Sequence, residues 1–277
     1  MTDEHTVTGE ALATSLQAIE ETEPLVQQLT NEVTKNDLAN ITLHWGALPV
    51  MADAPGEAPE MAELAGAILL NTGRMTDSNV EALHAAGQAA NDLGVPVVLD
   101  PVGAGATPTR EEVHESLLAE VDFAAIKGNH GEISHLAGVE AEVKGVESIG
   151  DYDEIGETAR ALAESTGAIV VASGVEDVVA DADAAYRVAA GHEMLSEVVG
   201  TGCMLGASLA AFCGSLEDEL TATLHGTLAY GIAGERAAER AYDGPASYRI
   251  NFLDAVYGLT PAVAGDLALE GRVEQTS

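Results

Sequence analysis

Short apolar runs rich in β-branched residues alternate along the chain with longer segments whose apolar residues recur every three or four positions. The runs predict strands over 67–73, 95–101, 121–129 and 168–174, and the longer segments predict helices over 78–94, 109–120, 151–167 and 200–214. Two further strands are expected over 177–181 and 184–190. The run VPVVLDP is apolar up to Asp100, as in strands of a sheet covered on both faces. The alternation predicts an α/β fold, a doubly wound and mostly parallel sheet with helices on both faces.

The chain has 277 residues, enough for one large α/β domain or for two small ones. No internal repeat and no long linker divides it, so we expect a single domain over 24–277. Residues 1–23 are acidic and amphipathic, and they predict a helical extension rather than a signal peptide. Every apolar run is shorter than the ~18 residues of a membrane-spanning helix, so we expect a cytoplasmic protein with no membrane partner.

Acidic residues outnumber basic ones by 46 to 11, which gives a net charge of −35. They are spread between the apolar runs instead of forming one block, as solvated faces would be. Nucleic acid and anionic membranes are poor partners for such a chain. We interpret the charge as adaptation to a salty, halophilic cytoplasm, because at roughly 1 M salt the Debye length falls to about 3 Å and self-repulsion is screened. Cys203 and Cys213 would lie about 15 Å apart on one helix, too far for a disulfide.

Four of the predicted strands lead directly into polar corners that contain glycine: NTG (71–73), DPVGAGAT (100–107), KGNHGE (127–132) and ASG (172–174). In open parallel sheets, ligands bind outside the carboxyl ends of the strands, so we expect these corners to face one crevice. The stretch GTGC (200–203) predicts a glycine turn that feeds a helix, whose free N–H groups and dipole favour a phosphate. An ordinary glycine-rich loop before a buried helix is the alternative. The chain has no GxxxxGK[ST] and no GxGxxG after its early strands, so a P-loop or dinucleotide fold is not supported.

Four side chains at these corners could act on phosphate or metal. Asp100 ends a strand, where a carboxylate can hold Mg²⁺ directly or through water, or can simply cap the turn. Asn129 and Glu132 are three residues apart, so both can face one side of a helix start. Lys127 is one of only three lysines in the chain. A phosphate partner would account for its retention, and an isolated surface lysine is the alternative.

These residues carry a resemblance. GTGC, the Asn-x-x-Glu of NHGE and the strand-end Asp100 resemble the ribokinase-like superfamily of small-molecule kinases. More specifically, the chain from about residue 24 to about residue 255 is similar to the hydroxyethylthiazole kinase family, through NDLANITLHWGALPVMADAPGE (36–57), LDPVGAGATPTR (99–110), KGNHGEI (127–133) and GTGCMLGA (200–207). The resemblance implies a ribokinase-like fold without a lid domain. It also implies phosphorylation of the primary alcohol of 4-methyl-5-(2-hydroxyethyl)thiazole, for thiamine salvage, by ATP and Mg²⁺ in a homotrimer with sites between subunits.

The resemblance implies three groups of site residues: substrate-binding Met51, Gly200, Asn36 and Asn40, ATP-binding Lys127, Ser173, Asn129 and Gly202, and metal-binding Asp100 and Glu132. Cys203 matches the position at which related kinases commonly carry a catalytic base. A helix N-terminus lowers the pKa of a thiol, whereas bound ATP opposes thiolate formation. Two roles therefore stay open for Cys203: acceptor of the alcohol proton, or small residue that packs or contacts substrate.

Two other classes of function remain. A different ribokinase-like enzyme, such as a pyrimidine kinase, a sugar kinase or an ATP-dependent hydrate dehydratase, could share GTGC, but segment 36–57 favours a thiazole. A catalytically inactive sensor of the same fold would bind ATP without turnover. Intact Asp100, Asn129, Glu132 and GTGC speak against the sensor.

Overall fold

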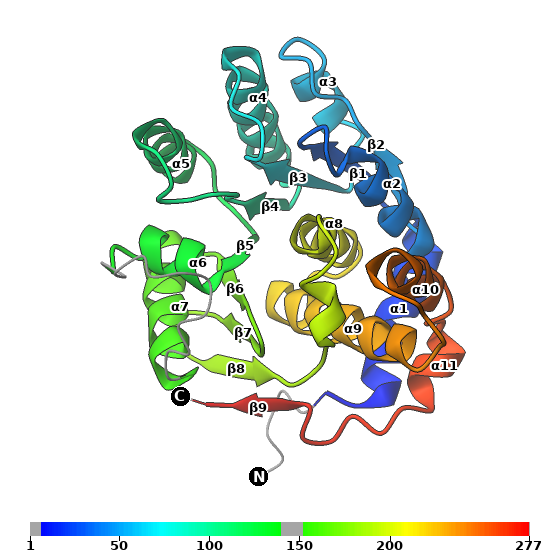
Figure 1. The fold of residues 1–277 in the computed structure, drawn as a ribbon. Helices are drawn as coiled ribbons and strands as arrows, with labels where there is room; N and C mark the ends of the chain where they lie inside the picture. Colours follow the sequence, from blue (N-terminus) through cyan, green and yellow to red (C-terminus); the bar gives the residue numbers. More distant parts are fainter. Residues whose placement is uncertain (1–6, 140–151, 277) are drawn as a thin grey trace.

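The computed structural model describes residues 7–139 and 152–276. One nine-stranded sheet runs through this part of the chain in the order β2-β1-β3-β4-β5-β6-β7-β8-β9 (Figure 1). Neighbours from β2 to β6 pair in parallel, and β7, β8 and β9 are antiparallel additions. The strands are β1 Leu25–Leu29, β2 Leu48–Val50, β3 Ala67–Asn71, β4 Val97–Asp100, β5 Ala125–Asn129, β6 Ile169–Ser173, β7 Asp177–Ala180, β8 Ala185–Val188 and β9 Val273–Gln275. This is the mostly parallel sheet that the sequence pattern predicts.

Helices cover both faces of the sheet (Figure 1), and each layer buries its own apolar cluster against it. One layer holds α1 Gly9–Thr22, α2 Lys35–His44, α8 Thr201–Cys213, α9 Glu219–Ala238, α10 Pro245–Tyr257 and α11 Pro261–Gly265. The other holds α3 Ala58–Ala62, α4 Asp77–Leu93, α5 Pro108–Glu120, α6 His130–Leu136 and α7 Tyr152–Thr166. A short 3₁₀ helix, η1 Glu193–Leu195, precedes α8. No helix of the described residues is long and apolar enough to cross a membrane.

All six predicted strands and all four predicted helices are present, with ends that differ by a few residues. Three strands were not predicted. In β1 the interior positions Gln27 and Gln28 are polar and yet completely buried, so the apolar signal of a central strand is missing. β2 is three residues long with Pro49 at its centre, which fits an edge strand, and β9 lies at the opposite edge.

Helix α1 lies in the segment that was predicted as an N-terminal extension. Thr8 caps it by accepting a hydrogen bond from Ala11 N at 3.1 Å. Leu12, Leu16 and Ile19 are buried in the cluster that also contains α8 and α9, and α1 packs against α11. The helix is therefore a part of the layer that covers the sheet, while the division of the chain at residue 24 stays a prediction.

Helix α8 is the element that positions the site. It is buried on all sides after its first turn, between the sheet and α9. Gly206 lets it approach β3 and β4, because a Cβ there would lie 3.2 Å from Leu69 and 3.6 Å from Asp100. The N-terminus of α8 consequently lies above the carboxyl ends of the central strands. The chain passes from β1 to β2 on one side and then crosses to β3 on the other, so the helices that follow the neighbouring strands β1 and β3 lie on opposite faces of the sheet. Such a switch point in the strand order forms a crevice for ligands.

Candidate active site

Side chains from the strand ends and the N-terminus of α8 meet at the carboxyl edge of the sheet. Asp100 ends β4 and Lys127 lies in β5, and both are almost completely buried. Lys127 Nζ is 3.4 Å from Asp100 Oδ1. A Cβ at Gly202 would lie 3.2 Å from Lys127 Nζ, so the ammonium group reaches the first turn of α8. Four of the residues predicted from sequence therefore come together: Asp100, Lys127, Gly202 and, on the same turn, Cys203.

The charges of this pair are coupled. Burial lowers the pKa of Lys127, but the Asp100 and Glu132 carboxylates outweigh that effect and the pKa is raised overall. Burial raises the pKa of Asp100, and Lys127 and a hydrogen bond from Asn71 act in the opposite direction. Lys127 is therefore protonated at neutral pH, and its charge offsets the free-energy cost of burying the Asp100 carboxylate.

Asn71, the last residue of β3, makes hydrogen bonds to several other residues of the site. Its Oδ1 accepts from Gly73 N at 3.0 Å and from Asn31 Nδ2 at 3.1 Å. Because a backbone N–H can only donate, the amide has one possible orientation, and Nδ2 must face the other way. Nδ2 donates to Asp100 Oδ2 at 2.5 Å and to Cys203 Sγ at 3.3 Å. Asn31 and Asn71 were not among the predicted site residues, although NTG after a predicted strand was the available signal for Asn71.

The first turn of α8 offers backbone N–H groups to a ligand. Gly200 is its N-cap, has φ of +96°, and as a glycine brings no side chain to cap the helix. A Cβ at Gly200 would lie 2.7 Å from Thr34 Cγ2, so the position requires glycine for both conformation and space. Thr34 precedes α2, and this contact joins the start of α2 to the start of α8. A helix N-terminus of this kind binds anions through its N–H groups and dipole.

Cys203 lies in the first turn of α8, and its thiol is partly buried. Its sulfur accepts from Asn71, with Asn31 Nδ2 at 3.8 Å. Burial and the neighbouring Asp100 raise the pKa of Cys203 to about 11, although Lys127 acts to lower it. The thiol is therefore protonated at neutral pH. Of the two roles left open by the sequence, the geometry favours a neutral contact group over a thiolate base.

Asn129 and Glu132 bind each other at the start of α6. Asn129 Oδ1 accepts from Glu132 N at 2.9 Å, and Glu132 Oε2 accepts from Asn129 N at 2.8 Å, which is a capping box. The second oxygen of Glu132 accepts from Gly103 N at 2.8 Å. Glu132 thus ties the corner after β4 to the corner after β5.

The carboxylates could hold a magnesium ion through its water shell. Both oxygens of Asp100 and both of Glu132 already accept hydrogen bonds from protein groups. No cluster of three or more His, Cys, Asp or Glu side chains with metal-site geometry occurs among the described residues. Mg²⁺ loses water reluctantly and is commonly held by one or two carboxylates together with substrate phosphates. Asp100 and Glu132 could therefore hold a hydrated Mg²⁺.

Ser173 ends β6 directly opposite Asn129 of β5. Its hydroxyl donates to Gly128 O at 3.2 Å, so this side chain is held against the corner of β5. The next residue, Gly174, packs on His130, where a Cβ would lie 2.5 Å from the imidazole Nε2. The two segments predicted to contact ATP are therefore interlocked.

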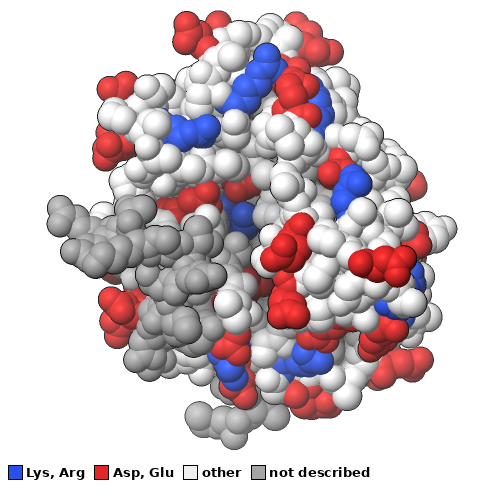
Figure 2. Space-filling model, in the orientation of Figure 1, with Lys and Arg blue, Asp and Glu red and all other residues white. Residues whose placement is uncertain are grey.

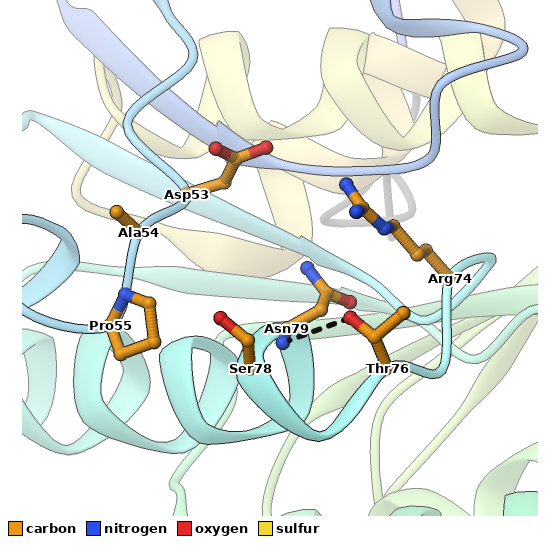
Figure 3. Close-up of a pocket in the computed structure, with 7 residues that line it drawn as sticks. All are labelled: Asp53, Ala54, Pro55, Arg74, Thr76, Ser78 and Asn79. Atoms are coloured by element: carbon orange, nitrogen blue, oxygen red, sulfur yellow. Dashed lines mark hydrogen bonds between the residues drawn. The ribbon is translucent and has the colours of Figure 1, made fainter.

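The predicted substrate-side residues lie on α2 and after β2. Asn40 Nδ2 donates to Asn36 O at 2.7 Å and to Asn36 Oδ1 at 3.2 Å, so these two residues bond to each other within α2 and not to Asp100 or Lys127. Met51 follows β2 and is partly buried against the core. Beyond it, the chain forms one wall of a cavity of about 230 Å³ (Figure 3), lined by Asp53, Ala54, Pro55, Arg74, Thr76, Ser78 and Asn79.

Comparison with known proteins identifies the family of the chain. The model of the hydroxyethylthiazole kinase family matches residues 16–262. The chain is 50% identical to a hydroxyethylthiazole kinase of Haloquadratum walsbyi over 264 residues, which is 94% of this chain and 92% of the relative. It is 49% identical to that of Natronomonas pharaonis over 267 residues, 95% of each chain.

The chain belongs to the hydroxyethylthiazole kinase family.

A solved structure titled as a hydroxyethylthiazole kinase protein from Pyrococcus horikoshii OT3 superposes with a TM-score of 0.86 at 36% identity, covering 96% of this chain and 99% of that one. The ribokinase-like fold implied by the sequence resemblance is thereby confirmed, as is membership of a kinase family. The assignments of individual site residues stay predictions, and the geometry described above is what supports each of them.

Proposed function

We propose that this protein transfers the γ-phosphoryl group of ATP to the primary hydroxyl of 4-methyl-5-(2-hydroxyethyl)thiazole, the substrate that gives its family its name. The observation that carries the proposal is the buried Lys127–Asp100 pair facing the N-terminus of α8. Phosphoryl transfer depends mostly on positioning and on neutralising negative charge. A buried cation beside free backbone N–H groups supplies both at one point.

Each side of the crevice has a proposed role. Lys127 and the amides of Gly202 and Cys203 neutralise the transferred phosphate, and Ser173 and Asn129 flank the nucleotide. When bound, a hydrated Mg²⁺ near Asp100 and Glu132 supplies further positive charge. Gly200 contacts the alcohol side of the substrate, and Met51, Asn36 and Asn40 form the thiazole side. Cys203 contacts the reacting hydroxyl as a neutral thiol, because a loose transition state needs little help from a base.

We also propose a homotrimer with sites between subunits. Apolar side chains are exposed on α2, on β2 and on α10, and α2 contacts each of the other two elements: Leu43 at 53%, Leu48 at 43%, Ile250 at 61% and Tyr257 at 71%. β2 is moreover an edge strand of the sheet. A subunit contact over these elements would cover the apolar side chains and would lie beside the Met51 segment. Light scattering in high salt would test this, and a monomer would contradict it.

We infer a salty cytoplasm as the working environment of the enzyme. Figure 2 shows acidic side chains in many separate groups over one face, with few basic ones between them. With a net charge of −35, the folded chain repels itself unless salt screens the charges.

The deciding experiment is phosphoryl transfer from ATP to hydroxyethylthiazole in about 2 M KCl with Mg²⁺, a salt level chosen to screen the surface charge. Hydroxymethylpyrimidine serves as the parallel acceptor, and product mass identifies what was phosphorylated. Thiazole phosphate with little pyrimidine product supports the proposal. ATP binding without any product from the folded protein would replace it with the sensor function.

A further inference from the structure

Gln27 is a polar side chain in β1, the strand next to edge strand β2, at a buried position where an apolar side chain would be expected. It lies in β1 and is completely buried, on the same face of the strand as Leu29. Its Nε2 donates to Ala52 O at 3.0 Å and to Ala58 O at 2.9 Å. A buried amide costs free energy unless it is hydrogen-bonded; here the NH₂ group is paired with these two carbonyl groups, whereas Oε1 is buried with no hydrogen-bond partner among the described residues.

The two carbonyls bracket the segment 52–58, which directly follows Met51 and leads into α3. Both are acceptors, so only the NH₂ group of Gln27 can serve them, and the side chain has a single orientation. The Gln27 amide thus holds both ends of the loop 52–58. Within the loop, the carbonyl of Ala54 accepts from the N–H groups of Glu57 and Ala58, which closes a compact turn.

The outer surface of the loop has a second attachment. Lys35 Nζ, at the start of α2, is 2.6 Å from Asp53 Oδ2, and both side chains are about one-quarter exposed, at 27% and 26%. Figure 3 shows Asp53, Ala54 and Pro55 side by side as the wall opposite the start of α4. Gln27 therefore holds this wall from inside the molecule and Lys35 holds it from outside.

We propose that Gln27 is a positioning residue that fixes the Met51–Pro55 segment for the thiazole substrate. The inference rests on the proposed function, because it takes Met51 to be a thiazole contact. Gln27 has no part in ATP binding, because its partners lie on the far side of β1 and β3 from the strands that carry Lys127 and Ser173. If Gln27 has this role, its replacement should raise KM for hydroxyethylthiazole and leave KM for ATP unchanged.

The test is Gln27→Met, which keeps the length of the side chain and removes both donors. We expect KM for hydroxyethylthiazole to rise about tenfold, since each lost hydrogen bond changes an equilibrium by a factor of roughly 2 to 12. KM for ATP and kcat should stay within about twofold. Gln28→Met is the matched control, because Gln28 is the next residue of β1, is equally buried, and donates on the opposite face to Thr42 Oγ1 at 2.7 Å. It should lower thermal stability to a similar extent without changing either KM more than about twofold.

A folded Gln27→Met enzyme whose thiazole KM matches that of the wild type would overturn the inference. So would equal increases in both KM values, which would indicate general loosening of the sheet. If Gln27→Met does not fold, Lys35→Gln tests the same loop from outside, and an unchanged thiazole KM there counts against the proposal. Failure of the proposed function is separate, because it appears as absence of thiazole phosphorylation by the wild-type enzyme itself.

Discussion

Removing the buried cation, by Lys127→Met, should damage stability and catalysis for two separable reasons. At 3.4 Å, two unit charges attract by about 5 kcal/mol for an effective dielectric constant near 20. Most of this attraction offsets the cost of burying the two charges, so the pair itself contributes little. Removing one partner is different, because Asp100 is 1% exposed and would remain as an unpaired buried carboxylate. The expected loss of unfolding free energy is about 3 to 5 kcal/mol.

The loss should depend on pH with a definite sign. Burial already raises the pKa of Asp100, and without Lys127 it rises further. The folded variant then binds a proton at Asp100 more tightly than the unfolded chain, so the contribution of this group to stability is greatest at low pH and is lost as pH rises through its folded-state pKa. The double variant Lys127→Met with Asp100→Asn carries no buried charge. It should recover most of the stability and lose the added pH dependence.

Catalysis should not recover with stability. Loss of a preorganised positive group facing the transferred phosphate typically costs about 10² to 10³ in rate, and Asn at position 100 cannot replace it. Denaturation and kcat/KM for ATP, both measured in about 2 M KCl so that surface charges are screened, separate the two effects. Arg240→Met is the control, since it removes a cation whose pair with Asp254 is exposed and should change stability by less than about 1 kcal/mol. Equal stability losses in the single and double variants, or a rate within about threefold of wild type, would refute the reasoning.

Three further predictions concern pH and salt. Because the pKa of Cys203 is raised to about 11, the pH profile of kcat should show no thiol inflection between pH 6.5 and 9. Cys203→Ser should lower kcat less than about tenfold. A thiol inflection near pH 8 would instead support a thiolate base. Burial raises the pKa of Asp177 from 3.8 to about 6, so its contribution to stability is present below pH 4 and is lost as pH rises through 6. Unfolding curves of wild type and Asp177→Asn should therefore diverge between pH 4 and 6, and parallel curves would contradict the assignment. The midpoint of thermal unfolding should rise steadily as KCl increases from about 0.2 M to about 2 M, and a salt-independent midpoint would remove the case for a halophilic protein.

Much of the architecture could be predicted from the sequence, because apolar runs and glycine corners report directly on buried strands and their ends. The strand ending at Asp100 and the helix opening at Gly200 are examples. β1 could not be predicted in this way. Gln27 and Gln28 lie on its two opposite faces, both buried, and the groups that accept their hydrogen bonds lie in other segments. No local sequence pattern indicates a buried polar side chain whose partners are distant in sequence.

The sequence suggested candidate site residues but not the hydrogen bonds that they make in the structure. Sequence spacing suggested that Asn129 and Glu132 share one side of a helix start, and in the structure they do, but they bind each other and Gly103. Asn31 and Asn71 are 40 residues apart in sequence and meet through a 3.1 Å hydrogen bond only because β1 and β3 are neighbours in the sheet. A resemblance to a family suggests which residues belong to a site. Which hydrogen bonds hold those residues in place becomes visible only in the folded structure.

The charge of the whole chain and the charge of the site act independently of each other. A chain with a net charge of −35 would be expected to repel ATP, and in dilute solution it should. In molar salt the Debye length is about 3 Å, so surface carboxylates are screened before their field reaches the crevice. Lys127 is 4% exposed and contacts the start of α8 directly, so salt has little access to it. Salt that screens the acidic surface therefore leaves the charge of Lys127 at the N-terminus of α8 largely unscreened.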